Sequence, residues 1–335
     1  MPLIPRIRRG PRGPKLPAAV LQREPRIDAI SEGTLRWLNI EQPSAIDLDA
    51  LAAQFDFHEL DYEDVLSRRQ RPKVDEYPTY LFVVLHFPFY DKAAGRLNTA
   101  ELDAFLGPDF LITLPNVPLR SLNRVFHRCE ADKEFRAEVL NKGAGYLFYR
   151  VINELFDYCF PILDKIGHKL DEIEDGIFEG RAKEMVRQIS NAKQEIIAYR
   201  KIIKPELTTL RVLELKANKL DRLGTSDGSE SLDVYFDDVI DAGERIWDIL
   251  ENYKEIIEAL EGTSETVIQH RLNDILLALT IISATVLPVT LVTSVYGMNL
   301  DLPFQHLDHA FWIVSGMMVA VFVAFVGYFR YKRWF

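Results

Sequence analysis

Small polar residues recur along an uncharged stretch near the C-terminus, which runs from Ile275 to Leu300 and contains Tyr296-Gly297-Met298-Asn299. Their intervals of three, four and seven place them on one stripe of a helix. The stripe comprises Asn273, Leu276, Thr280, Ser283, Leu287, Thr290, Ser294 and Gly297. Hydroxyl, carbonyl and carboxamide oxygens replace part of a cation's water shell, so the stripe is able to line a cation pathway. Small hydroxyl residues also mediate dry helix packing in membranes, and the spacing alone leaves both interpretations open.

Three leucines and the residues at the end of this stretch also fit a cation pathway. Leu276, Leu279 and Leu287 would form hydrophobic constrictions. The side-chain oxygen of Asn299 can accept hydrogen bonds from the waters of Mg²⁺, which sheds its inner-shell water reluctantly. Gly297 permits a close backbone approach and a non-helical turn, which would bring main-chain carbonyls to the same mouth.

Two stretches of the chain are long and apolar enough to cross a membrane. Ile275 to Leu300 and Ala310 to Phe329 carry no charged residue, and about 20 apolar residues span a hydrocarbon core. Arg330, Lys332 and Arg333 follow the second stretch, whereas the connecting loop has no Lys or Arg. The positive-inside rule therefore predicts a multi-pass protein of the inner (plasma) membrane with both termini cytoplasmic. Gly316, Ala320 and Ala324 form a small-residue stripe that suits packing on a neighbouring helix.

Composition narrows the function classes. The 335 residues have a formal net charge of −10, and the acidic excess lies after a basic, proline-rich stretch at the N-terminus. An acidic body argues against a nucleic-acid partner and favours cations. Cys129 and Cys159 lack metal-type spacing and are expected to be inert thiols. We expect no enzyme, because the clustered acids have no His or nucleophile beside them; these acids are Glu63, Asp64, Asp171, Glu172, Glu174 and Asp175.

The Gly-Met-Asn triplet at the end of the first apolar stretch resembles the signature of the CorA-type divalent-cation transporters, a family that includes the zinc-transporting ZntB branch. Glu63-Asp64-Val65-Leu66 and Gln70-Arg71-Pro72-Lys73-Val74 resemble the family's soluble-domain motif, and Arg330 to Phe335 resembles its tail. The likeness covers roughly residues 35 to 335. It implies a homopentameric channel in which the polar stripe lines a central pore and Gly297, Met298 and Asn299 form the selectivity filter. The sequence has no Walker-type Gly-x-x-x-x-Gly-Lys-Ser/Thr motif for nucleotide hydrolysis, so we expect passive uptake driven by the membrane potential.

The resemblance also implies regulation by a bound metal. Glu63 and Asp64 would face Asp238 on the stalk helix of a neighbouring subunit, and Mg²⁺ bound there would hold the channel closed. The alternative is that these residues are solvated surface acids. A membrane-anchored sensor or scaffold that conducts nothing is a more distant alternative, and it would need neither the polar stripe nor Asn299.

The transported ion is predicted to be Mg²⁺, because the proposed filter offers oxygen but no sulfur or imidazole. The loop after the filter departs from the acidic Met-Pro-Glu-Leu of many magnesium-transporting members, since it reads Leu300-Asp301-Leu302-Pro303-Phe304-Gln305-His306. His306, Asp308 and His309 could instead form an outer-loop metal site that favours Zn²⁺, with Co²⁺ and Ni²⁺ as further candidates.

The expected fold is an α+β, mainly α membrane protein with an N-terminal α/β cytoplasmic domain, a long stalk helix and two C-terminal transmembrane helices. Strands are predicted at 34–40, 80–89, 98–106 and 110–114, and helices at 46–55 and around 121–140. Helical structure is predicted from about residue 145, with breaks at Lys204-Pro205 and at 224–229. A helix from about 231 to 297 would contain Gly243 and Gly262, either as flex points or as packing positions.

The predicted domains follow from these elements. They are a basic, proline-rich disordered tail (1–30), the α/β cytoplasmic domain (31–142), a helical hairpin (143–228), the stalk (229–273), a first transmembrane helix that lines the pore (274–298), an outer loop (299–309), a second transmembrane helix (310–330) and a basic cytoplasmic tail (331–335).

Overall fold

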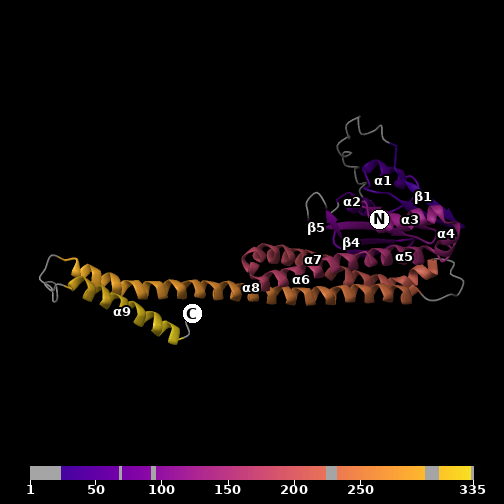
Figure 1. Ribbon diagram of the computed structural model, residues 1–335. Coiled ribbons are helices and arrows are strands. Elements are labelled where there is room, and N and C mark those ends of the chain that lie inside the picture. The colour runs from indigo at the N-terminus through magenta and orange to yellow at the C-terminus, as the bar shows by residue number, and fades with distance from the viewer. Residues whose placement is uncertain (1–23, 68–69, 92–95, 224–231, 299–308, 333–335) are drawn as a thin grey trace, which may run out of the picture. The chain divides into compact units, whose positions relative to one another are not determined.

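The computed structural model describes residues 24–67, 70–91, 96–223, 232–298 and 309–332 (Figure 1). The chain divides into two compact units. The first unit combines residues up to 171 with residues 190–257, and the second combines residues 172–189 with residues from 258 onward. Of the predicted segments, most of the N-terminal tail, the loop at 224–229, and nearly all of the outer loop lie outside the described residues.

Within the first unit, the described strands form one six-stranded sheet with the order β1-β2-β6-β5-β4-β3. The pair β2–β6 is parallel and the other neighbouring pairs are antiparallel. The strands are β1 Asp28–Glu32, β2 Leu35–Asn39, β3 Lys73–Glu76, β4 Leu81–Asp91, β5 Arg96–Leu106 and β6 Phe110–Pro115. The four predicted strands are therefore confirmed, while β1 and β3 escaped prediction.

The sheet is buried on both faces. Phe82 and Phe105 pack with residues of α1 (Ala45–Ala52) and α2 (Glu59–Ser67) on one face. Phe87 points to the opposite face, where its ring lies 5.6 Å from that of Phe156 in α5 (Ala144–Asp157). The predicted run Leu81-Phe82-Val83-Val84-Leu85 is 0% exposed throughout, as expected for a strand covered on both sides.

Strand β1 begins inside the segment that was predicted to be a disordered tail. Ile30 is buried at 7% exposure, and the backbone N–H of Arg26 donates a hydrogen bond to Asp47 Oδ1 at 2.8 Å. Pairing with β2 and this contact fix the segment despite the prolines that precede it. The boundary at residue 30 is thus wrong, and ordered structure starts before it.

Helices follow the sheet: α3 Arg120–Ala131, α4 Lys133–Leu140, α5, α6 Cys159–Gly176 and α7 Ala182–Leu223. A π-helical turn, η1 Ile177–Arg181, joins α6 to α7, and Gly180 adopts a φ of 86° there, which favours glycine. Pro205 lies inside α7, so the predicted break at Lys204-Pro205 is wrong. Ile203 and Leu210 are buried on either side of it, and this packing offsets the roughly 3 kcal/mol that an interior proline costs.

A single helix, α8, runs from Leu232 to Tyr296 and agrees with the predicted limits to within one residue. A Cβ on Gly243 would lie 2.8 Å from Leu207 Cδ2, which identifies Gly243 as a packing position. Around a Cβ on Gly262, no described atom lies within 4 Å apart from its chain neighbours and the backbone of its own helix. Helix α9 spans Ala310–Tyr331. Among the described residues, α8 and α9 each contain a window apolar enough to cross a membrane, with mean hydropathy 2.5 and 2.1.

The second unit contains the C-terminal part of α8, α9 and the η1 turn. The guanidinium of Arg271 donates a hydrogen bond from Nη1 to the carbonyl of Gly180 at 3.0 Å. Ser264 is buried and donates its hydroxyl to the carbonyl of Ala182 at 3.3 Å. These contacts fasten the η1 turn to α8 at the point where the apolar stretch begins.

Candidate ion pathway and regulatory sites

Helix α8 has one covered face and one uncovered face in its apolar part. The covered residues recur at helical spacing; they are Leu277, Ile281, Ala284, Thr285, Pro288, Val289, Val292 and Tyr296. Thr285 retains only 4% exposure, and Phe329 of α9 retains 5%. On α9 the covered residues Val314, Met318, Val321, Phe325 and Phe329 likewise share one face. Both faces are thus covered within the second unit, which contains the end of α8 and α9.

The predicted pore stripe lies on the uncovered face of α8. Asn273, Leu276, Leu279, Thr280, Ser283, Leu287, Thr290 and Ser294 are all exposed in the chain. At 100° per residue, the stripe is centred roughly opposite the covered face. The polar groups therefore do not mediate packing between α8 and α9. Dry helix packing within a single chain is thus excluded as the role of the stripe.

Threonine hydroxyls in α8 donate their hydrogens to the helix backbone. Thr280 donates to the carbonyl of Leu276 at 2.7 Å, and Thr290 donates to that of Val286 at 2.6 Å. A hydroxyl whose hydrogen is already used presents its oxygen as an acceptor to anything beside the helix. Along the stripe, these oxygens suit a cation or the donating waters around it.

The mouth of the proposed pore lies at the end of α8. Gly297 donates its N–H to the carbonyl of Thr293 at 2.9 Å, and Met298 donates to that of Val295 at 3.2 Å. A Cβ on Gly297 would lie 3.1 Å from the Thr293 carbonyl oxygen, which leaves little space for a side chain. Asn299, His306 and Asp308 lie outside the described residues, so the filter and the outer-loop metal site stay predictions. His309 is exposed and precedes α9 as its N-cap residue.

The small-residue stripe of α9 also faces away from α8. Gly316, Ala320 and Ala324 are exposed and lie opposite the covered face of their helix. In the part of the chain that the structure describes, nothing lies within 4 Å of a Cβ placed on Gly316. Its packing partner, if it has one, is therefore not α8 of the same chain.

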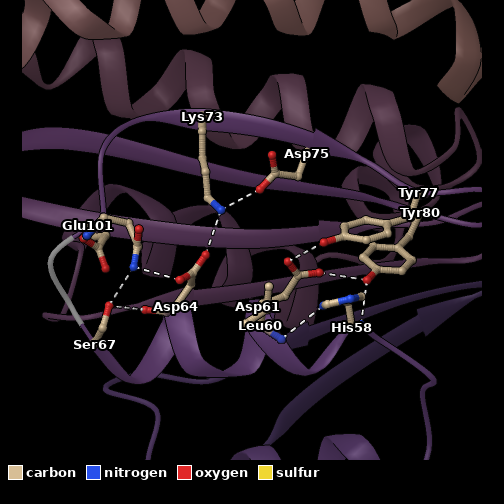
Figure 2. Close-up of polar contacts among 11 residues, drawn as sticks. His58, Leu60, Asp61, Asp64, Ser67, Lys73, Asp75, Tyr77, Tyr80 and Glu101 are labelled. Carbon is tan, nitrogen blue, oxygen red and sulfur yellow. Dashed lines mark hydrogen bonds and ion pairs between the residues drawn. The ribbon is translucent and has the colours of Figure 1, made fainter.

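Figure 2 shows the acidic motif of α2, where Asp64 is held by its own chain. Lys73 Nζ lies 2.7 Å from Asp64 Oδ2, and Gln70 donates from Nε2 to Asp64 Oδ1 at 2.8 Å. Lys73 also pairs with Asp75 at 2.5 Å. Although burial lowers the pKa of Lys73, hydrogen bonds to Asp64 and Asp75 raise that pKa to about 12. Glu63, by contrast, is exposed.

Asp61, one turn before Asp64, has a different role. It is 1% exposed, and its carboxylate accepts hydrogen bonds from the hydroxyls of Tyr77 at 2.9 Å and Tyr80 at 2.8 Å (Figure 2). Burial raises the pKa of Asp61, and it also raises that of Tyr77 to about 12. These bonds fix α2 against the connection between β3 and β4, and so they position the helix that carries Glu63.

Asp238 lies on α8 and is exposed. The hydroxyl of Tyr149 donates to Asp238 Oδ2 at 3.4 Å. Burial, followed by the charges of Glu154 and Asp238, raises the pKa of Asp157 on α5. Asp64 and Asp238 thus have separate surroundings in one chain, and the described residues contain no group of three or more His, Cys, Asp or Glu side chains that could hold a metal ion.

Two buried acids behind the motif escaped prediction. Glu101 and Asp103 lie on one face of β5 at 3% and 1% exposure. Glu101 Oε2 accepts a hydrogen bond from the backbone N–H of Gln70 at 3.2 Å. Burial, then the charges of Glu101 and Asp64, raises the pKa of Asp103 well above its ordinary value. Two acids two residues apart in the otherwise apolar second half of the strand, from Ala100 to Leu106, were the available signal in the sequence.

Comparisons with known proteins agree with the fold and with the predicted family. The profile of the family described as CorA-like Mg²⁺ transporter protein matches residues 32–333. YfjQ of Bacillus subtilis is 29% identical over 303 residues, which cover 89% of each chain. The cobalt/magnesium transport protein CorA of Thermotoga maritima is 28% identical over 308 residues, covering 90% of this chain and 84% of that protein. The complete structure of the CorA magnesium transporter from Methanocaldococcus jannaschii matches with a TM-score of 0.78 at 22% identity, covering 93% and 95% of the two chains.

The fold is that of a membrane protein with a soluble N-terminal domain, a long helix and two apolar C-terminal helices, as predicted. The chain belongs to the CorA-like Mg²⁺ transporter family. Proteins of this family transport divalent cations, so the predicted family and the main predicted function, divalent-cation transport, are confirmed.

Proposed function

We propose that this protein is a passive divalent-cation uptake channel, assembled as a homopentamer in the inner (plasma) membrane. The observation that carries the proposal is the exposed, charge-free stripe on α8, whose hydroxyl-bearing residues are left uncovered by the described part of the chain. In a ring of such helices, hydroxyl oxygens would alternate with the Leu276, Leu279 and Leu287 constrictions. Asn299 would form the filter ring together with Gly297 and Met298.

The membrane potential supplies the driving force in this proposal. A divalent cation gains roughly 4.6 kcal/mol per 100 mV when it enters a negative compartment, at about 2.3 kcal/mol per charge. Arg330 and Lys332 follow the second span, which supports cytoplasmic termini and hence inward movement. The soluble domain would then sample the ion after its passage.

Metal binding by that domain would close the channel. Glu63 is exposed on a helix that buried Asp61 anchors, and Asp238 lies in acidic surroundings with Asp157. Like charges repel, and a bound divalent cation offsets that repulsion. The proposed regulatory site joins Glu63 and Asp64 of one subunit to Asp238 of the next, with Mg²⁺ as both cargo and regulator.

Mg²⁺ is favoured as the cargo because the exposed stripe offers only oxygen ligands, which suit a hard and hydrated cation. Transport of Zn²⁺, Co²⁺ or Ni²⁺ by the same fold is the alternative, and it depends on His306, Asp308 and His309. Imidazole ligands would select a borderline-soft metal over Mg²⁺.

Ion flux into proteoliposomes under an inside-negative potential tests the channel. Asn299→Ala should assemble but not transport, because one substitution removes the carboxamide from every subunit of the ring. Asn252→Ala is a matched control, since Asn252 is an exposed asparagine on α8 outside the apolar stretch. Wild-type flux through the Asn299→Ala protein would show that the filter assignment is wrong.

Competition between ions tests the cargo. With Mg²⁺ and Zn²⁺ both supplied, replacement of His306 and His309 by alanine should leave Mg²⁺ entry nearly intact. If the wild type never carries Mg²⁺ and the double variant loses Zn²⁺ flux, the zinc assignment is correct and the magnesium assignment fails.

A further inference from the structure

The second unit leaves one large apolar side chain exposed at the η1 turn between α6 and α7. Phe178 is 70% exposed there, whereas its neighbour Ile177 and Met185 beyond the turn are buried at 1% and 2% exposure. A Cβ on Gly176 would lie 2.5 Å from Met185 Sδ, so the ends of α6 and α7 pack closely against each other. The turn therefore has an apolar interior of its own, and Phe178 lies outside it. Exposure alone indicates no partner, because single exposed apolar residues are common on protein surfaces.

The position of the turn along α8 does indicate a partner. The carbonyl of Ala182 accepts a hydrogen bond from Ser264, and the carbonyl of Gly180 accepts one from Arg271, which lies further along α8. From Ala182 back to Gly180, the contacts thus advance along α8, and the apex of the turn points toward the apolar stretch that starts at Ile275. An arginine side chain reaches back toward the N-terminus of its helix, so Gly180 lies on the order of 10 Å before the level of Ile275.

A bilayer crossed by α8 has its headgroups at this level. The hydrocarbon core is about 30 Å thick and the whole bilayer about 40–45 Å, which leaves roughly 5–8 Å of headgroup region on each side. With Ile275 at the edge of the core, the backbone of the turn lies at the outer boundary of that region. A side chain at the apex is then within reach of the headgroups, and Phe178 is the exposed aromatic residue of the turn.

The charged groups of the turn suit a headgroup surface. Arg181 lies 2.6 Å from Glu179 and neutralises it, so the apex carries no excess of negative charge. Arg271 adds a positive charge beside Gly180. The exposed acids Glu174 and Asp175 belong to the last turn of α6, before the apex, and would stay in water. Guanidinium groups pair well with phosphates, and they favour an anionic leaflet.

We propose that the η1 turn is a membrane-surface contact, in which Phe178 enters the headgroup region of the bilayer that α8 crosses. Arg181 and Arg271 would face lipid phosphates beside it. Aromatic rings are favoured at this depth, where an apolar body meets a polar surface. A second copy of the chain is the alternative cover, and lipid is favoured because the turn points toward the apolar stretch. The proposal requires α8 to cross a membrane, but it does not depend on the pore or on the transported ion.

Spin labels on the full-length protein in phosphatidylcholine–phosphatidylglycerol nanodiscs test the contact. Cys129 and Cys159 are buried, so a nitroxide reagent modifies an introduced cysteine. Phe178→Cys is compared with Val186→Cys, an exposed position on α7 beyond the turn. The label at 178 should collide often with dissolved oxygen and rarely with a water-soluble nickel chelate, and the label at 186 should do the reverse. Frequent nickel collisions at 178 would overturn the proposal, and shielding from both reagents would show that protein covers the turn instead of lipid.

A second measurement tests the native phenylalanine itself. A label at Lys183→Cys, an exposed position in the first turn of α7, reports the depth of the turn while Phe178 is kept or replaced. Burial of a phenylalanine ring favours the docked turn about tenfold or more, so Phe178→Asp should lower the oxygen-to-nickel collision ratio at 183 to the value in water. Val186→Asp is the matched control and should leave that ratio unchanged. An unchanged ratio in Phe178→Asp would show that the ring does not hold the turn at the membrane.

Discussion

Thr290 and Thr285 form a matched pair that separates a pore face from a packing face. Each donates its hydroxyl to the carbonyl four residues earlier at 2.6 Å, so Thr→Val removes the same local bond at both positions. They differ in surroundings, because Thr290 is exposed on the stripe and Thr285 is 4% exposed on the covered face. Only Thr290→Val should change the side chains that line the proposed ion pathway.

The size of the effect follows from the number of hydroxyls in the proposed ring. If each oxygen contributes about 0.6–1 kcal/mol net to a hydrated cation, five of them contribute roughly 3–5 kcal/mol. Since 1.36 kcal/mol corresponds to a factor of ten, flux should fall at least about a hundredfold. The isopropyl groups that Thr290→Val introduces would not replace the lost acceptors, and a further apolar ring would favour dewetting of the pore.

The assay is Mg²⁺ entry into proteoliposomes at a clamped inside-negative potential, with equal amounts of assembled protein verified by size-exclusion chromatography. We expect Thr285→Val to retain at least about half of the wild-type flux, because the valine fits a covered site of the same shape and loses one modest bond. If both variants lost the same share of the Mg²⁺ flux, the hydrogen bond to the helix backbone would control transport, and not the face of α8 on which the threonine lies. Wild-type flux in Thr290→Val would refute the pore stripe.

Three further predictions follow from individual contacts. Asp238→Lys should mimic a bound cation and protect the assembly from protease without Mg²⁺; protection that still requires Mg²⁺ would exclude the gating role. Gly297→Ala should lower ion flux without preventing assembly, because the new Cβ would lie 3.1 Å from the Thr293 carbonyl, and unchanged flux would show that the mouth tolerates it. Burial raises the pKa of Glu206 well above its ordinary value, so the folded state keeps the proton that the unfolded state loses. Stability should therefore fall with rising pH above the ordinary Glu pKa, by at most about 1.4 kcal/mol per pH unit, and Glu206→Gln should flatten that dependence in thermal unfolding; equal slopes for the two proteins would contradict it.

Long periodic segments were the predictable part of the fold. The apolar run around Val83 and the uninterrupted pattern of α8 each specify one element, because no alternative buries so much apolar surface. Short elements with mixed patterns were not predicted. Strand β3 is partly exposed along its length and is specified mainly by its pairing with β4, which a local pattern does not reveal.

Pro205 shows how tertiary packing overrides a local signal. An isolated helix would end near it, since proline removes a hydrogen bond and clashes with the preceding turn. In the folded chain Tyr199 and Leu213 are fully buried on the same helix, and the packing of α7 as a whole outweighs the local cost.

The sequence placed the candidate site residues on particular elements but did not reveal which side chains they contact. Spacing alone placed Thr280 and Thr290 on one face, and the structure adds that this face is not the one covered in the hairpin. The motif around Asp64 indicated a set of acids, whereas the structure shows that Asp64 already pairs with Lys73, which it shares with Asp75. Such a pairing joins the end of a helix to the following strand, and periodicity carries no information about it.

The Lys73 pair constrains how a regulatory metal could act. An ammonium at 2.7 Å already supplies the positive charge that a cation would bring to Asp64, so a metal ligated directly by Asp64 must displace Lys73 or share the carboxylate with it. Both side chains are partly exposed, which makes the pair weak enough to break but still a competitor. Glu63 has no such competition within the described residues and projects from the same helix into solvent. The first contact of a hydrated cation with this motif is therefore expected at Glu63, with Asp64 and Lys73 setting the local charge and buried Asp61 holding the helix in place.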